Sequence, residues 1–341
     1  MKLQSGARVA VAGAGALGSA IAVRLARSGW TVTVFDPAGP GDNASGVAAG
    51  MLAPVSEAVF DSASREHLAI MRRARDLWPA FAEDFGIPLS RVGVRFEGAE
   101  TWRASVAERL RGLGLAEADF TDEDWRIEAR PALAALRRAA EAAGARFEPR
   151  AVADFAPGAL MLDDGRTHAF DALVLATGPG ARDGRLAPET KVLGPIKGQI
   201  LRIATAPDGP VVRGDGVYLA PGEIGAIGAT MEAGRDDRLP DASATQTLRA
   251  AAWALRPDLD LDAATVEVGV RVTTPDGLPL VGWSAAPGVM LAVGARRNGW
   301  LFAPLVAGMV AAYLNGDNPG PDAAAMDARR FEKPEGQRAG E

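Results

Sequence analysis

The chain of 341 residues contains no cysteine and only two histidines, His67 and His168. Without cysteine it can form no disulfide, no thiolate nucleophile, no thiolate metal site and no link to a cofactor through sulfur. The two histidines lie far apart in the sequence and outside any motif. They therefore predict neither a histidine-rich zinc site nor histidine acid–base catalysis.

Long apolar runs and an excess of positive charge are missing as well. The apolar segments Val9–Val23 and Trp300–Leu314 are both shorter than the roughly 20 residues that a membrane-spanning helix needs, and Pro304 interrupts the second. The net charge of −6 offers no basic surface to nucleic acid or to an anionic membrane. We expect a cytoplasmic protein of two domains, without a targeting segment, that binds neither nucleic acid nor membrane.

The most informative segment reads RVAVAGAGALGSAIAVRLARSGWTVTVFDP. Its apolar pattern predicts a strand at 9–12, a helix at 19–28 and a second strand at 31–35. Gly13, Gly15 and Gly18 have the G-x-G-x-x-G spacing of a dinucleotide site, and Asp36 stands where a carboxylate can accept from ribose hydroxyls. An acid at this position disfavours NADP, whereas NAD and FAD both remain open.

The next segment, DNASGVAAGMLAP at 42–54, favours FAD over NAD. An NAD domain would normally continue with another strand and helix here, but this segment consists mainly of small and apolar residues and is rich in glycine. Ala48, Ala49 and Gly50 would let the backbone lie close to the longer FAD molecule. Later in the chain, a buried strand ends in Thr177-Gly178, as in FAD proteins whose late strand returns to the first sheet.

Further elements follow from periodicity and turn residues. Asp164-Gly165 predicts the turn of a hairpin, and two strands within 216–232 predict an antiparallel sheet that also contains 197–206. Helices are expected at 130–143, at 244–259 and from Gly299 to about Asn315.

Four motifs distributed over nearly the whole chain resemble one family. They are the glycine-rich unit at 13–36, ASGVAAGMLAP, PIKGQ at 195–199, and the pair RVTTPDGLPLVG with RNGWLFAP. With them the chain resembles the D-amino-acid oxidase group of flavoproteins, and within that group the glycine oxidases of thiamine biosynthesis. The resemblance implies an α/β fold: a Rossmann-like FAD-binding domain with a parallel sheet and helices, and a smaller substrate domain built on an antiparallel sheet.

The resemblance also implies a division of the chain. The FAD-binding domain would comprise 1–84, 129–186 and 264–325, the substrate domain 85–128 and 187–263, and a polar tail would follow at 326–341. Segment 85–128 is shorter and less recognisable than in the family, so the sequence does not predict its structure. The last residues of the tail are expected to be mobile.

The resemblance implies non-covalent FAD, held by backbone and small side chains. A helix that starts near Gly299 would direct its N–H groups at the pyrimidine end of the flavin, where reduced flavin carries negative charge. The predicted cofactor residues are Gly13, Gly15, Ala16, Leu17, Gly18, Asp36, Ser45, Ala48, Ala49, Gly50, Met51, Leu52, Val152, Thr177, Gly178, Asn298, Gly299, Trp300 and Leu301.

The resemblance assigns four residues to the substrate: Arg271, Arg297, Tyr218 and Met231. Arg271 alternates with valines, so by its pattern alone it could face water. Its counterpart in the family binds the substrate carboxylate through two parallel hydrogen bonds, for which a planar guanidinium is well suited. Arg296 stands where relatives usually carry another residue type, and its role is open. No acid–base residue is expected, which fits direct hydride transfer to the flavin.

The resulting expectation is FAD-dependent oxidative deamination of glycine or a small amino acid, in thiamine biosynthesis, with dioxygen as acceptor. The products would be a 2-oxo acid such as glyoxylate, ammonia and hydrogen peroxide. Sarcosine and D-proline-type secondary amino acids remain alternatives, with oxygen or another acceptor. Two other functions also remain alternatives: a non-catalytic dinucleotide-binding regulator and an NAD-dependent dehydrogenase. The sequence is compatible with a homo-oligomer and does not define one.

Overall fold

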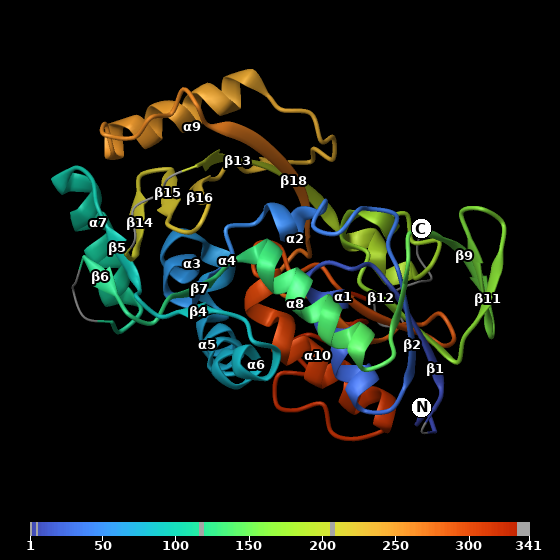
Figure 1. Cartoon of the computed structure of the whole chain (residues 1–341). Helices are drawn as coiled ribbons and strands as arrows, with labels where there is room; N and C mark the ends of the chain where they lie inside the picture. The colour runs from blue at the N-terminus through green and yellow to red at the C-terminus, as the bar shows by residue number, and fades with distance from the viewer. Residues whose placement is uncertain (1, 5, 116–118, 205–208, 333–341) are drawn as a thin grey trace, which may run out of the picture.

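The molecule consists of a parallel sheet with its helices and a second, largely antiparallel sheet with its own helices (Figure 1). The structure is a computed structural model, and it describes all residues except 1, 5, 116–118, 205–208 and 333–341. The tip of the predicted tail lies outside the described residues. Both halves contribute to the cavities described below.

The first sheet has six strands, and its inner strands are parallel. In spatial order the strands are β19 (Leu280–Trp283), β20 (Val289–Val293), β12 (Ala172–Leu175), β1 (Arg8–Ala12), β2 (Thr31–Phe35) and β8 (Arg146–Glu148). Only β19 is antiparallel to its neighbour. Successive β1 residues face opposite sides, so Val9 and Val11 join one apolar core while Ala10 and Ala12 join another.

Different structures cover the two faces of this sheet. Figure 1 shows three helices together on one face: α1 (Ala16–Arg27), α8 (Ala129–Ala142) and α10 (Gly299–Asn315). The other face meets a small antiparallel sheet of β9 (Val152–Ala156), β10 (Ala159–Leu162) and β11 (Thr167–Ala169). The hairpin predicted at Asp164-Gly165 is confirmed, since β10 and β11 pair across it. Gly165 has φ +81°, a backbone conformation that favours glycine.

The second sheet has eight strands and is mainly antiparallel. Its strands, in spatial order, are β17 (Glu232–Ala233), β13 (Gly194–Ile203), β16 (Gly225–Gly228), β15 (Val217–Ala220), β14 (Val211–Gly214), β5 (Val94–Phe96) and β6 (Phe120–Thr121), with β18 (Thr265–Thr273) also paired to β13. Helix α9 (Ala242–Leu255) packs on the outer face. Helices α7 (Glu100–Gly112) and α3 (Pro54–Phe60) contribute to a separate apolar cluster on this sheet. The predicted antiparallel sheet is confirmed.

Two observations bear on the predicted division of the chain, which stays a prediction. The range 264–325 was assigned to the FAD-binding domain, and β18 within it pairs with β13 from Gly194 to Arg202, so this strand belongs to the second sheet. The polar tail was expected to begin at 326, and Met326 and Ala328 within it are buried, with the Val281 N–H donating to the Met326 carbonyl.

The smaller elements connect the two halves. A three-stranded sheet joins β3 (Met51–Leu52), β7 (Trp125–Ile127) and β4 (Leu89–Ser90). The short helices are α2 (Ala44–Val47), α4 (Ser62–Arg65), α5 (Leu68–Asp76) and α6 (Trp78–Phe85), with 3₁₀ turns at Gly178–Ala181 and Pro188–Val192. Segment 85–128 therefore contributes strands to two different sheets, which its sequence alone did not predict.

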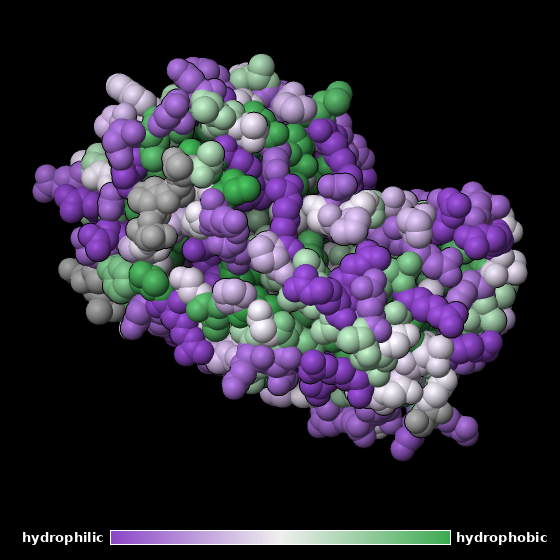
Figure 2. Space-filling model, viewed as in Figure 1, coloured by the Kyte–Doolittle hydropathy of each residue, from purple (hydrophilic) through white to green (hydrophobic). Residues whose placement is uncertain are grey.

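Within the described parts of the chain, no helix has the length and apolar character that crossing a bilayer requires. On the face seen in Figure 2, hydrophilic residues predominate and hydrophobic ones form small, scattered patches.

Candidate functional site

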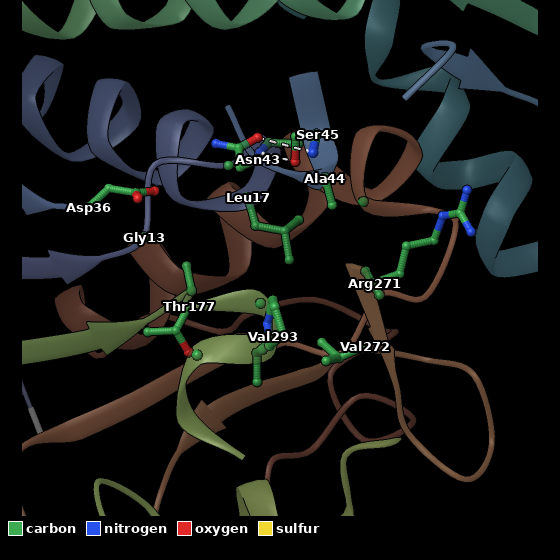
Figure 3. A pocket seen from close by; sticks show the side chains of 18 of the residues that line it. Gly13, Leu17, Asp36, Asn43, Ala44, Ser45, Thr177, Arg271, Val272 and Val293 are labelled. Carbon is green, nitrogen blue, oxygen red and sulfur yellow. Dashed lines mark hydrogen bonds between the residues drawn. The ribbon is translucent and has the colours of Figure 1, made fainter. Parts of the chain in front are cut away.

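A cavity of about 480 Å³ opens at the carboxyl ends of β1, β2 and β12. Ligands of open α/β sheets bind at this edge. Figure 3 shows Asp36 at one end of the cavity and Arg271 at the other, with Leu17, Thr177 and Val293 between them. The cavity is therefore elongated, and it connects the glycine-rich turn after β1 with strand β18.

The glycine-rich turn is built for close backbone packing. Gly13 has φ +106°, and a Cβ there would lie 2.3 Å from the Ala176 carbonyl oxygen. A Cβ on Gly18 would lie 1.9 Å from the Gly13 carbonyl oxygen, so this glycine serves the contact between helix and turn. Gly15 caps the start of α1 and lines the cavity. The first turn of α1 consequently faces the cavity with N–H groups that suit an anion.

Asp36 and the segment after β2 complete this end of the cavity. The carboxylate of Asp36 accepts from the Ala14 N–H at 2.7 Å and from the Ala38 N–H at 2.9 Å, which fixes its orientation. The side chain of Asn43 caps α2 by accepting from the N–H groups of Ser45 and Gly46. The acid is thus held rigidly at the edge of the cavity.

A second cavity, of about 270 Å³, adjoins the first. Its lining includes Tyr218, Met231, Glu57 and Arg213. The residues that line both cavities are Ala48, Arg271, Arg297 and Trp300. Since these residues are shared, the two cavities meet at Arg271.

The structure sorts the predicted cofactor residues into three groups. Those that line the first cavity are Gly13, Gly15, Ala16, Leu17, Asp36, Ser45, Ala48, Val152, Thr177, Gly178, Gly299 and Trp300. Ala49, Gly50 and Met51 line the second cavity instead. Gly18, Leu52, Asn298 and Leu301 line neither of these cavities. The members of this last group are buried, so they can support the site through packing.

Arg271 is placed to receive an anion. It projects from β18 beside β13, where a Cβ on Gly198 would lie 2.2 Å from its Nη1 atom, so glycine makes room for the guanidinium. Nη1 lies 3.5 Å from the Met231 sulfur. Among the described residues, no carboxylate lies within ion-pair distance of Arg271. Burial is the main factor that lowers its pKa, while the nearby Tyr218 opposes this shift. The guanidinium stays charged at neutral pH.

Arg297 and Arg296, adjacent in sequence, both reach Asp61 but differ in their nearest partner. Arg297 Nη2 lies 2.5 Å from Glu57 Oε2 and 3.8 Å from Asp61 Oδ2, and Arg296 forms an ion pair with Asp61. Arg296 adopts φ +51°, a left-handed conformation that is uncommon for this residue type. Burial opposes ionisation of Asp61, but the hydrogen bond from Ser64 and the two arginines lower its pKa overall. Arg296, which the sequence left unexplained, thus pairs with an acid at the cavity wall.

Glu57 and Arg213 are site residues that sequence reasoning missed. Glu57 Oε1 accepts from Arg213 Nη2 at 3.2 Å, and both residues are buried. Each carries a weak signal in the sequence, because Glu57 interrupts the apolar PVSEAVF and Arg213 interrupts the apolar strand VVRG. Burial raises the pKa of the neighbouring Tyr218, so its hydroxyl stays protonated.

Neither histidine lines the first or the second cavity. His67 Nε2 is 3.1 Å from the Asp276 carbonyl oxygen, and His168 packs edge-on against Phe35. Burial is the main factor that lowers the pKa of His168. Over the described ranges, no group of three metal-binding side chains is found.

Comparison with known proteins identifies the class. The model of the FAD dependent oxidoreductase family matches residues 8–313, so the chain belongs to this family. The lining of the first cavity fits such a cofactor, because Gly13 and Gly15 bring backbone to the helix start and the cavity extends from Asp36 to Arg271.

Two curated relatives align along nearly their whole length. A glycine oxidase of Geobacillus kaustophilus is 31% identical over 89% of this chain and 91% of its own. A putative thiamine biosynthesis oxidoreductase of Rhizobium etli is 32% identical over 90% of this chain and 96% of its own. The crystal structure of the Geobacillus kaustophilus glycine oxidase superposes with a TM-score of 0.82 at 29% identity, covering 96% of this chain and all of that one.

Proposed function

We propose that this protein is an FAD-dependent oxidase of glycine or another small amino acid. The observation that carries the proposal is Arg271, a guanidinium at the junction of the two cavities that has no carboxylate partner among the described residues. A planar fork of this kind suits a substrate carboxylate. The two relatives support glycine oxidation and a role in thiamine biosynthesis.

The chain's own groups would bind and orient the substrate. Arg271 would hold the carboxylate and thereby set the position of the α-carbon at the mouth of the first cavity. Tyr218, kept protonated by burial, would offer its hydroxyl as a hydrogen-bond donor. FAD held in the first cavity would supply the two-electron oxidation of the α-carbon–nitrogen bond, in which dioxygen takes up the two electrons and two protons as hydrogen peroxide. The imino acid left behind would react with water to give ammonia and a 2-oxo acid.

The first turn of α10 would stabilise negative charge that develops on the cofactor. Gly299 and Trp300, at the start of this helix, both line the first cavity. Helix N-termini present free N–H groups and the positive end of the dipole, so an anion there is favoured.

Secondary amino acids such as sarcosine are the second candidate. The second cavity, about 270 Å³ in volume, gives room for an N-substituent. A regulator without catalysis is less well supported, because binding a dinucleotide needs no free guanidinium at the far end of the cavity.

The proposal includes dioxygen as acceptor and a cytoplasmic location, and it leaves the oligomeric state open. The bifunctional protein ThiO/ThiG of Trichormus variabilis is 29% identical to this chain, which spans only 55% of that protein. An additional activity of that kind is not proposed for this chain.

The test is to purify the protein, record its visible spectrum and measure peroxide in air with glycine, sarcosine and D-alanine. A flavin spectrum with peroxide from at least one of these substrates is expected. A colourless protein that binds NAD would exclude the proposal. Flavin reduction without oxygen consumption would instead indicate a dehydrogenase.

A further inference from the structure

The motif PIKGQ at 195–199 lies at the start of β13, and none of its residues lines the first or the second cavity. Its lysine, Lys197, is fully buried, and the ammonium donates to the Asp237 carboxylate at 2.7 Å. A buried charge is costly unless it is paired, so this contact ties the segment around Asp237 to β13.

The segment tied down in this way comprises residues 234–241, here called the strap, which leads from β17 to the start of α9. PIKGQ holds both of its ends. The Gly234 N–H donates to the Pro195 carbonyl at 2.9 Å, and the Asp241 N–H donates to the side-chain oxygen of Gln199 at 2.7 Å. The motif therefore serves to position the strap.

The strap reaches the first half of the molecule at two points. An oxygen of Asp236 lies 2.6 Å from Arg182 Nη2, in the segment that follows β12. Nη1 of Arg238 donates to the Asp42 carbonyl at 3.3 Å, in the segment that follows β2. Of the strap residues, all of which the structure describes, Arg238 alone lines the first cavity.

Arg238 has no acidic partner in the described part of the chain. Its neighbours Asp236 and Asp237 are both paired with other cations. Asp42 offers its backbone carbonyl, and no ion pair joins its carboxylate to Arg238. The guanidinium at the cavity is therefore available to an anion.

The contact with Asp42 brings Arg238 close to the start of α1. Residues 43–45 follow Asp42 and line the first cavity, where Figure 3 shows them between its two ends. Ser45 Oγ accepts from the Ala16 N–H at 2.9 Å, which joins this segment to the first turn of α1. In a dinucleotide site, that helix start receives the pyrophosphate.

We propose that Arg238 binds the pyrophosphate of FAD and that PIKGQ anchors the strap for this purpose. The pyrophosphate is the central part of FAD, between adenosine and flavin, and it needs donors besides the N–H groups of α1. An arginine supplies charge-assisted hydrogen bonds, which are stronger than neutral ones. The inference concerns the cofactor and does not depend on which amine is oxidised.

The test measures FAD binding rather than turnover. Serial dilution of the purified holoprotein, with released FAD followed by its fluorescence, gives a dissociation constant for each variant. Arg238→Met should raise this constant about tenfold at low ionic strength, because charge-assisted hydrogen bonds to phosphate are lost. Since Arg238 is exposed, added salt should reduce the difference. A dissociation constant equal to that of the unmodified protein would overturn the inference.

Arg95→Met is the matched control. Arg95 is also exposed and belongs to the second sheet, on β5, but it does not line the first cavity. Its FAD constant should equal that of the unmodified protein. Equal weakening in both variants would show an effect of net charge alone and would contradict a contact with Arg238.

ADP locates the contact on the cofactor, because it carries the adenosine and the pyrophosphate without the flavin. The dissociation constant of ADP, obtained from its displacement of FAD, should rise in Arg238→Met by a similar factor. An unchanged ADP constant would place Arg238 against another part of FAD and overturn the assignment.

Arg182→Met tests the strap as the support of Arg238. Arg182 does not line the first cavity, so its loss should act through the strap. It should weaken FAD binding in the protein that retains Arg238 and have no further effect in Arg238→Met. Equal effects in both backgrounds would contradict the role of the strap.

Discussion

Replacement of Arg271 by alanine is the sharpest test of the site. The guanidinium lies where the two cavities meet. It contacts the Met231 sulfur and fills the space over Gly198, and no carboxylate of the described residues pairs with it. Its removal should therefore leave the fold and the cofactor cavity intact. It should remove the charged partner of the substrate carboxylate.

The size of the effect follows from the kind of contact. Loss of one partner of a buried, hydrogen-bonded charge pair costs about 2–5 kcal/mol. At roughly 1.4 kcal/mol per factor of ten, substrate binding should weaken between about thirtyfold and several thousandfold. Arg271→Lys keeps the charge but not the fork, so it should recover only part of the loss.

The assay has two readouts that separate binding from folding. The visible spectrum reports FAD content, and anaerobic titration with substrate reports apparent affinity. We expect Arg271→Ala to retain FAD and to lose affinity. Loss of FAD with unchanged affinity in the remaining holoprotein, or retention of both, would refute the assignment of this residue to the substrate carboxylate.

Three further predictions concern the supporting structure. Gly198→Ala should weaken substrate affinity while FAD is retained, because a Cβ would lie 2.2 Å from Nη1 of Arg271; titration as above checks it, and unchanged affinity would contradict it. Gly13→Ala should lower FAD content strongly, because of φ +106° and a Cβ 2.3 Å from the Ala176 carbonyl oxygen; full FAD loading would show that the turn tolerates a side chain. Asp124→Ala should lower the free energy of unfolding by about 1–3 kcal/mol, since two backbone N–H groups at the start of α3 lose their buried acceptor. Urea denaturation measures this, and an unchanged midpoint would mean that water replaces the carboxylate.

Local features of the sequence were enough to predict the dinucleotide end of the site. The turn at Gly13, the helix start at Gly15 and the acid at Asp36 all lie within one short unit, and each has a conformational or chemical requirement that only a few residue types meet. The strands and the helix follow one another in the order predicted, and Gly13, Gly15 and Asp36 line the first cavity, while their contact with FAD stays a prediction.

The substrate end could not be predicted in this way. Arg271 alternates with valines, and the same pattern would suit a solvent-facing residue, so only the family resemblance selected it. Glu57 and Arg213 are 156 positions apart in sequence and meet because α3 packs against the second sheet. No local pattern records such a contact.

The same reason explains why the sequence did not show that β18 joins the second sheet. Pairing of β18 with β13 joins segments about 70 residues apart, such as Gly198 and Gly269, and strand pairing of this kind depends on the whole fold. The burial of Met326 and Ala328 escaped prediction for a different reason. Both lie in the short segment DAAAMDARRF, which mixes alanines with charged residues, and a pattern that short predicts no packing.

The central claim is that a carboxylate on Arg271 positions an amine for oxidation by FAD. Rapid mixing of the purified, oxidised holoprotein with glycine and, in parallel, with glycinamide tests it most directly, because the two differ in the carboxylate while both carry the amine. The account predicts that the flavin absorbance bleaches with glycine, or with another small amino acid in the same series, and far more slowly with the matching amide. Equal bleaching by acid and amide, or none by any amino acid, would contradict it.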